Sequence, residues 1–110
     1  KRRIIANTYD KQINNKKIIK LNYSKYSVYH QYVIKSKNRK KLINIFNKVN
    51  IQYGFHYPFS INKLHAVRKI FKNKTFKNSE VLSKQGISLP IDPNLKKNEI
   101  KKIIRVINNF

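Results

Sequence analysis

Cysteine is absent from the sequence, which excludes a disulfide framework, a thiolate metal site and a cysteine nucleophile. Glycine is almost absent too, because Gly54 and Gly86 are the only two, and neither belongs to a glycine-rich phosphate loop. The three histidines lack metal-ligand spacing, and no cysteine or nearby carboxylate would complete a site with them. The sequence therefore predicts no metal site and no phosphate-binding loop.

Acidic residues are scarce as well, with four in the whole sequence. They are Asp10, Glu80, Asp92 and Glu99, and no two of them form a close pair of the kind that glycosidases use. Glu99 is expected in the first turn of a C-terminal helix, where a negative charge complements the helix dipole. We therefore assign no catalytic residue to the chain taken alone.

Long hydrophobic runs are missing, since the purely apolar stretches extend over only a few residues. A membrane-spanning helix needs about 20 such residues, and no apolar core follows a charged segment as in a secretory signal. We expect no membrane span and a cytoplasmic location. The chain also contains no methionine and begins at Lys1, which suggests a removed start or a piece of a longer protein.

Positive charge is what the sequence has in excess: 26 Lys and Arg residues against four acidic ones give a formal net charge of +22. Counterion release would let such a chain bind nucleic acid. However, Lys, Asn and Ile make up 53 of the 110 residues and share A/T-rich codons, and the lysines are scattered over the chain. We interpret the charge as mainly compositional and keep nucleic-acid binding as an alternative.

The apolar pattern alternates between helical and extended periods along the chain. Ile5, Tyr9 and Ile13 repeat every four residues, and the isoleucines between positions 100 and 107 form a strong one-sided stripe, as in amphipathic helices. β-branched and aromatic residues predict strands. We predict helices over 1–12, 37–49, 62–71, 78–84 and 96–110, strands over 28–34, 51–55 and 87–89, and a connector over 16–27 with room for a short strand at 18–21.

This order of elements predicts an α/β fold with one small three-stranded sheet. The expected N-caps of the three middle helices are Ser36, Asn62 and Asn78. Four tyrosines are spaced three residues apart, at Tyr23, Tyr26, Tyr29 and Tyr32. Because this spacing does not keep one face of a strand, we do not expect their rings to stack.

His56, Tyr57 and Pro58 follow the end of a predicted strand. Pro58 restricts the residue before it to an extended backbone, so two polar rings would be presented together at a turn. One interpretation is that both rings face a cleft and bind a ligand. The other is that Tyr57 packs into the fold and His56 is simply solvated, and the residues alone do not separate the two.

Several blocks then occur in an order typical of one enzyme family. They are residues 2–6 with Tyr9, 28–34, Arg39 with Leu42, 54–58, 76–80, 87–90, and Pro93 with Leu95, Glu99 and Ile100. In these blocks the chain resembles the C-terminal part of the DegT/DnrJ/StrS sugar aminotransferases over nearly its whole length. These pyridoxal-phosphate (PLP) enzymes transfer an amino group onto a keto-sugar nucleotide.

The resemblance implies a division of the chain into a connecting helix and linker over 1–26 and a small C-terminal α/β domain over 27–110. Its sheet would be mainly antiparallel, as in the C-terminal domain of fold-type I aminotransferases. The large PLP-binding domain, with the Schiff-base lysine, would lie outside this chain. The expected partners are that large domain or a second subunit, since relatives are homodimers.

The resemblance also implies a nucleotide-sugar substrate and an amino-acid amino donor, with His56 and Tyr57 as the candidate substrate contacts. The chain departs from the family after this turn, where Ser60 and Asn62 occupy positions that are commonly proline and histidine, so contacts made by that loop are expected to differ. We expect the chain alone to be inactive. A small basic nucleic-acid-binding module and a split-gene remnant that pairs with a separate large-domain chain are the alternatives.

Overall fold

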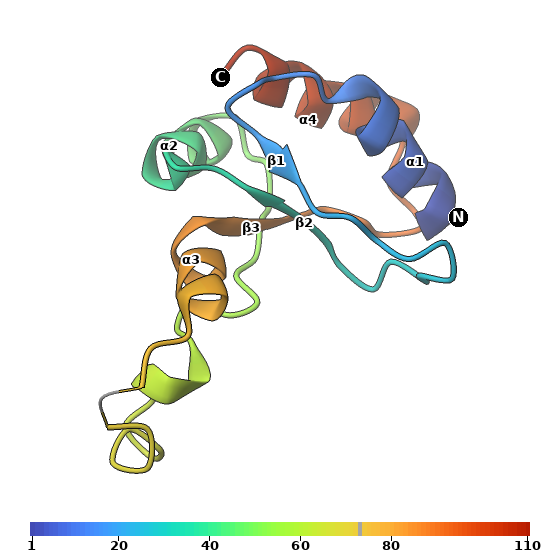
Figure 1. Cartoon of the computed structure of the whole chain (residues 1–110). Coiled ribbons are helices and arrows are strands. Elements are labelled where there is room, and N and C mark those ends of the chain that lie inside the picture. The colour runs from blue at the N-terminus through green and yellow to red at the C-terminus, as the bar shows by residue number, and fades with distance from the viewer. Residues whose placement is uncertain (73) are drawn as a thin grey trace.

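The computed structural model describes residues 1–72 and 74–110, which form a sheet covered by helices and a protruding arm (Figure 1). In chain order the elements are α1 (Arg2–Gln12), β1 (Ile19–Lys20), β2 (Tyr32–Lys35), α2 (Arg39–Lys48), the 3-10 helix η1 (Ile61–Lys63), α3 (Lys77–Gln85), β3 (Gly86–Leu89) and α4 (Lys97–Asn108). Within the described ranges no helix combines the length and the apolar character needed to cross a bilayer.

β2 is the central strand of a sheet with the order β1-β2-β3, and both of its pairings are antiparallel. Tyr32 pairs with Leu89 and Ile34 pairs with Ile87, and all four side chains are buried. These pairs put apolar side chains on one face because alternate residues of a strand share a face. The α/β fold with a small antiparallel three-stranded sheet is confirmed, with the short strand at 18–21 present as β1.

The core lies between this sheet and the terminal helices. α1 and α4 lie side by side above the sheet, and α3 lies on its other side next to β3 (Figure 1). The predicted stripes are confirmed, since Ile5, Tyr9 and the isoleucines of α4 are all buried. Burying one isoleucine side chain contributes about 1.5–3 kcal/mol, so the α4 stripe is a major part of what holds this helix in place. Glu99 lies in the first turn as expected, and its carboxylate accepts a hydrogen bond from the backbone N–H of Lys96 at 2.7 Å.

β2 starts at Tyr32 rather than at position 28, so the first half of the predicted strand is wrong. The reason is Tyr29, whose φ of 49° lies in the left-handed region and interrupts the extended chain. This bend brings the rings of Tyr23, Tyr29 and Tyr32 together, with centroids 5.1–6.4 Å apart, whereas Tyr26 stays exposed. Contrary to our expectation, three of the four tyrosines do pack on one another, because Tyr23 and Tyr29 lie on irregular segments and only Tyr32 lies on a strand.

Two buried tyrosines also fix neighbouring segments through their hydroxyl groups. Tyr32 donates a hydrogen bond to Asp10 Oδ1 at 2.5 Å, and Tyr9 donates one to the carbonyl of Pro90 at 2.8 Å. Burial raises the pKa of both hydroxyls well above the ordinary value, so they remain neutral donors at physiological pH. The bond from Tyr9 ties α1 to the segment that follows β3.

All three predicted helix caps are wrong, and Asn62 lies inside η1, whose N-cap position is Ser60. Ser36 directly follows β2. Its backbone N–H donates to the carbonyl of Gln85 at 3.0 Å, and its hydroxyl accepts from the N–H of Asn38 at 3.2 Å. Asn38 is the N-cap position of α2 instead. Helix α3 begins one residue earlier than expected, with Phe76 and not Asn78 at its N-cap position.

The predicted strand over 51–55 is reduced to a single bridge. Gly54 and Ser88 exchange both backbone hydrogen bonds, at 3.1 and 2.9 Å, on the free edge of β3. The start of the segment is held by α2, because the N–H of Ile51 binds the carbonyl of Phe46 at 2.9 Å. The segment therefore meets β3 at one position and does not run along it.

The helix predicted over 62–71 is also wrong. Residues 57–72 and 74–76, here called the arm, extend away from the body of the molecule and contain only η1 and successive turns (Figure 1). Of the side chains expected to point inward from this helix, Leu64 is 44% exposed, and Val67 and Phe71 are only half-buried. A short helix needs tertiary burial of its apolar face for stability, and the body offers no surface to this segment.

The arm is attached to α3 through Glu80. The side-chain amide of Asn62 donates to Glu80 Oε1 at 3.2 Å, and the ammonium of Lys63 lies 3.6 Å from the same oxygen. The hydrogen bond from Asn62, with Lys63 nearby, lowers the pKa of Glu80. This contact therefore persists at neutral pH and fixes where the arm leaves the body.

Candidate functional site

The turn formed by His56, Tyr57 and Pro58 lies where the chain leaves the edge of β3. The Gly54–Ser88 bridge holds the backbone two residues before His56. From there His56 Nδ1 approaches the Ser88 hydroxyl at 2.8 Å, and the peptide bond between His56 and Tyr57 is cis. The sheet edge thus positions the imidazole through one backbone bridge and one side-chain hydrogen bond.

Gly54 leaves the space that the imidazole occupies. A Cβ atom built at this position would lie 2.9 Å from Cε1 of His56 and 3.8 Å from Cβ of Ser88. The backbone conformation of Gly54 is accessible to other residues, since no glycine has a positive φ. Only the packing of His56 requires glycine at this position.

Replacing Gly54 by alanine is expected to displace the His56 ring from Ser88 while changing the free energy of unfolding by less than about 1 kcal/mol, because alanine also restricts the unfolded chain. The imidazole NMR signals of His56 and a urea unfolding curve would measure the two effects. Gly86→Ala is the matched control, because its Cβ would lie 2.7 Å from the carbonyl oxygen of Leu82. We expect this control to lower stability and leave His56 in place, and the opposite pattern would contradict the assignment.

Tyr57 is mostly exposed, whereas His56 is held by its contact with Ser88. The Tyr57 side chain is 74% exposed, and its ring meets the His56 ring edge-on with centroids 6.0 Å apart. The interpretation in which Tyr57 packs into the fold is therefore wrong. The structure brings the two predicted site residues together at the surface, and whether they bind a ligand stays a prediction.

A set of packed aromatic rings connects the turn at His56 with the core. The Arg39 guanidinium lies 4.7 Å from the centroid of the Phe55 ring and donates to the carbonyl of Ser83 at 2.6 Å. Tyr53 contacts both Phe55 and Phe46, with centroid distances of 5.5 and 6.2 Å. Phe46 itself is completely buried. The turn therefore rests on contacts that lead directly into the core.

His56 opens onto a shallow cavity of about 320 Å³ at the end of β3. Its lining residues are His30, Gln31, Gln52, Tyr53, Gly54, His56, Ser88, Leu89, Pro90, Ile91, Asp92 and Leu95. Two imidazoles and two amides supply donors and acceptors that suit hydroxyl groups of a ligand. None of the described lining residues is a lysine or arginine, so the cavity suits a sugar better than a diphosphate.

Most of this lining carries no signal in the sequence. His30 falls within the predicted strand over 28–34, but the left-handed bend at Tyr29 interrupts that strand and His30 lines the cavity. Gln52 and Asp92 lie on irregular segments that carry no periodic signal. The pairing of Gly54 with Ser88 holds the segment of Gln52 and His56 against β3, and a pairing of that kind cannot be read from one sequence.

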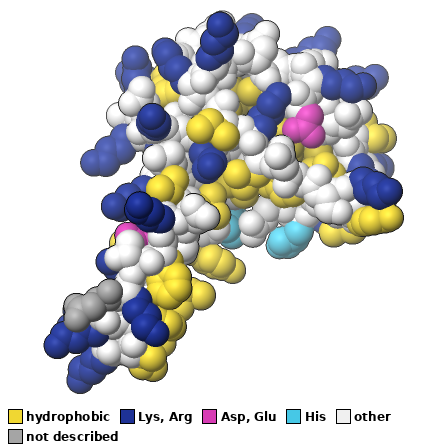
Figure 2. Space-filling view, viewed as in Figure 1, with side chains coloured by type: hydrophobic (Ala, Val, Ile, Leu, Met, Phe, Trp, Pro, Cys, Tyr) yellow, Lys and Arg dark blue, Asp and Glu magenta, His cyan; other side chains and the backbone are white. Residues whose placement is uncertain are grey.

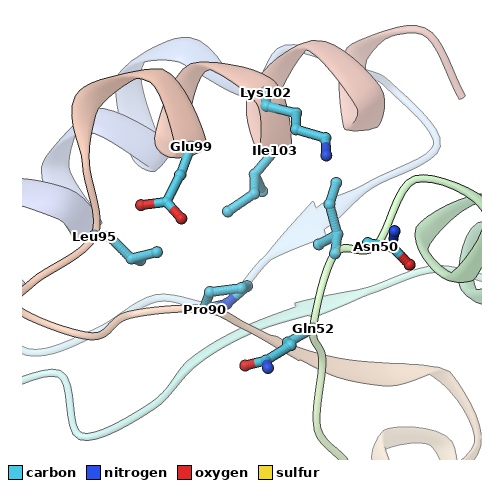
Figure 3. A pocket seen from close by; sticks show the side chains of 8 residues that line it. Asn50, Gln52, Pro90, Leu95, Glu99, Lys102 and Ile103 are labelled. Carbon is cyan, nitrogen blue, oxygen red and sulfur yellow. The ribbon is translucent and has the colours of Figure 1, made fainter.

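A second cavity of about 280 Å³ adjoins the first, sharing Gln52, Pro90 and Leu95 (Figure 3). Two of its charged groups already have structural partners. Glu99 accepts from the backbone of Lys96, and Lys102 donates to the carbonyl of Val49 at 2.6 Å. We therefore take the cavity beside His56, and not this one, as the candidate site.

Comparison with known proteins finds a family whose model matches almost the whole chain. A family model described as the DegT/DnrJ/EryC1/StrS aminotransferase family matches residues 1–108. A dTDP-3-amino-3,6-dideoxy-alpha-D-galactopyranose transaminase of Aneurinibacillus thermoaerophilus is 29% identical over 83 residues, which are 76% of this chain and 23% of that protein.

Solved structures have the same fold over a part of their length. DesV of S. venezuelae superposes with a TM-score of 0.92 at 20% identity, covering 98% of this chain and 30% of DesV. Spr1654 of Streptococcus pneumoniae, described as a sugar aminotransferase in its PLP form, gives a TM-score of 0.81 at 22% identity, covering 98% and 30% of the two chains. The chain thus spans less than a third of each of these three proteins.

Proposed function

The chain belongs to the DegT/DnrJ/EryC1/StrS aminotransferase family, and from this membership we propose that it forms the small domain of a PLP-dependent enzyme that aminates a nucleotide-linked keto-sugar. The family match over residues 1–108 is the observation that carries the proposal. The Aneurinibacillus relative, a transaminase of a dTDP-linked amino sugar, supports the substrate class. Residues 27–110 are proposed as the small domain, with residues 1–26 as the connecting helix and linker.

The residues of this chain do not fit a PLP site by themselves. PLP enzymes hold their cofactor through a lysine amine, and none of the described residues that line the cavity beside His56 is a lysine. We therefore place the cofactor and its lysine on the large domain of a family-length enzyme, outside this chain. PLP, when bound there, supplies the electron sink for amino transfer.

His56 and Tyr57 are proposed to bind the sugar part of the substrate. The imidazole, fixed by Ser88 at 2.8 Å, presents its other nitrogen as a donor or acceptor for a sugar hydroxyl. The exposed Tyr57 provides an aromatic edge and a hydroxyl at the rim of the same turn. An amino acid as amino donor, a second subunit as in relatives, and a cytoplasmic location belong to the same proposal.

The nucleic-acid alternative is not favoured by the comparisons or by the visible surface. On the face drawn in Figure 2, Lys and Arg side chains are spread over the body and the arm and do not gather in one patch. Proteins that bind nucleic acid usually cluster such residues on one face or groove. The charge therefore does not by itself identify a binding surface.

A chimera tests the proposed function. In it, this chain replaces the matched segment of the Aneurinibacillus transaminase, and amino transfer is assayed from dTDP-3-amino-3,6-dideoxy-α-D-galactopyranose to a 2-oxo acid. We expect activity from the chimera, none from the isolated chain, and no saturable one-to-one PLP binding by the isolated chain in equilibrium dialysis. A folded, PLP-binding chimera without activity would contradict the proposed function, and tight PLP binding by this chain alone would contradict the placement of the cofactor.

A further inference from the structure

The arm carries a concentration of exposed apolar side chains that its own fold does not explain. Six of the eleven large hydrophobic residues exposed in the described parts of the chain lie on it: Tyr57, Phe59, Ile61, Leu64, Ile70 and Phe76, which are 44–74% exposed. In Figure 2 the hydrophobic side chains gather along one flank of the arm, with Lys and Arg mainly on the other flank and at the tip. A contiguous apolar surface of this kind marks an interaction site.

The hydrogen bonds of the arm show that it is presented to the outside and not folded back on the body. The backbone bonds of Lys63, Leu64 and Arg68 all run to residues three or four positions earlier in the arm. Its attachment to the body is the contact of Asn62 and Lys63 with Glu80 on α3. The apolar flank is thus held away from the core while its base is fixed.

The charge of the arm disfavours a second copy of this chain as its partner. Between positions 57 and 76 the sequence has five cationic residues and no carboxylate, and the whole chain carries +22. Two such arms would bring like charges together, which costs free energy. The complementary surface is therefore apolar with a border of carboxylates.

The length of the related proteins indicates where such a surface is found. This chain covers 30% of DesV and 23% of the Aneurinibacillus transaminase, so most of each enzyme lies outside the matched part. We propose that the arm docks on that outer part of a family-length transaminase, at an apolar surface bordered by carboxylates. This inference rests on the proposed function, since it takes the transaminase as the partner. The arm starts directly after His56, so docking would bring the partner surface to the rim of the candidate cavity.

Tryptic cleavage within the arm tests the docking. The cleavage sites are Lys63, Arg68, Lys69, Lys72 and Lys74. We expect rapid cleavage at these sites in the isolated chain and a slowing of about tenfold or more in the chimera, because a docked segment must open before it is cut. The variant Phe59→Ser, Ile61→Ser, Ile70→Ser should restore rapid cleavage in the chimera.

Ile4→Ser with Val28→Ser is the matched control, because these residues are 71% and 68% exposed but lie outside the arm. This control should keep the arm protected. An arm that is cut as fast in the chimera as in the isolated chain overturns the proposal, and so does protection that appears in the isolated chain as its concentration rises. A protected arm in a chimera that lacks activity supports the docking and counts only against the proposed function, so the two failures are distinguishable.

Discussion

Replacing Phe46 by alanine is expected to lower the free energy of unfolding by about 3–5 kcal/mol, the usual cost of truncating a buried phenylalanine. Phe46 is completely buried on α2, and its carbonyl also accepts the hydrogen bond from the N–H of Ile51. A domain of this size has about 5–15 kcal/mol of stability in total. The variant should therefore be close to unfolding at ambient temperature, as measured by urea denaturation followed by circular dichroism.

The same substitution should also loosen the candidate site. Phe46 contacts Tyr53, which contacts Phe55, the residue directly before His56. We expect His56 to lose its fixed position in any Phe46→Ala molecules that remain folded. Phe59→Ala is the control, because this ring is 65% exposed and surface substitutions change stability by only about 0.5 kcal/mol. A loss below about 1 kcal/mol for Phe46→Ala would contradict the role of this ring as a core support.

The elements predicted correctly are those in which the hydrophobic period of the sequence agrees with the burial of the same side chains in the structure. α4 is the clearest case, since a run of isoleucines at helical spacing is buried as one stripe. β3, which lies within a short apolar segment ended by Pro90, is buried at every position. For such segments the local pattern and the tertiary environment favour the same structure, so the pattern alone is sufficient.

The errors fall where a contact distant in sequence decides the local structure. The segment over 62–71 has a helical pattern, but it finds no surface on which to bury it and forms turns instead. The tyrosine cluster depends on a single left-handed residue, Tyr29, which β propensity does not reveal. In both cases the missing information is which surface a segment meets, and one sequence does not contain it.

The candidate site shows the same division. His56 and Tyr57 were identified because a proline and a predicted strand end marked a turn. His30 and Asp92 line the same cavity, but the local sequence around them gave no sign of it. The local sequence thus pointed to one side of the candidate site, and the other side became visible only in the tertiary structure.

The largest functional effect is expected from His56→Ala in the active chimera. Removing a hydrogen-bonding group that a buried sugar hydroxyl needs costs about 1–3 kcal/mol, which corresponds to a loss of about 5- to 150-fold in kcat/KM. We expect most of this loss in KM, because the proposed contact is made to the sugar in both the ground state and the transition state. Steady-state kinetics with the dTDP-linked amino sugar would measure both constants.

Three further variants separate a contact with the substrate from a structural role of His56. His56→Gln keeps an amide that can donate and accept, so it should recover part of the loss. Ser88→Ala removes the 2.8 Å contact but keeps the imidazole, so it should give a smaller rise in KM with unchanged kcat. Tyr26→Ala removes a ring that is 75% exposed, lies outside the arm and does not line the cavity, so it should leave both constants unchanged. Equal effects of His56→Ala and Tyr26→Ala, or a loss confined to kcat, would show that His56 does not bind the sugar.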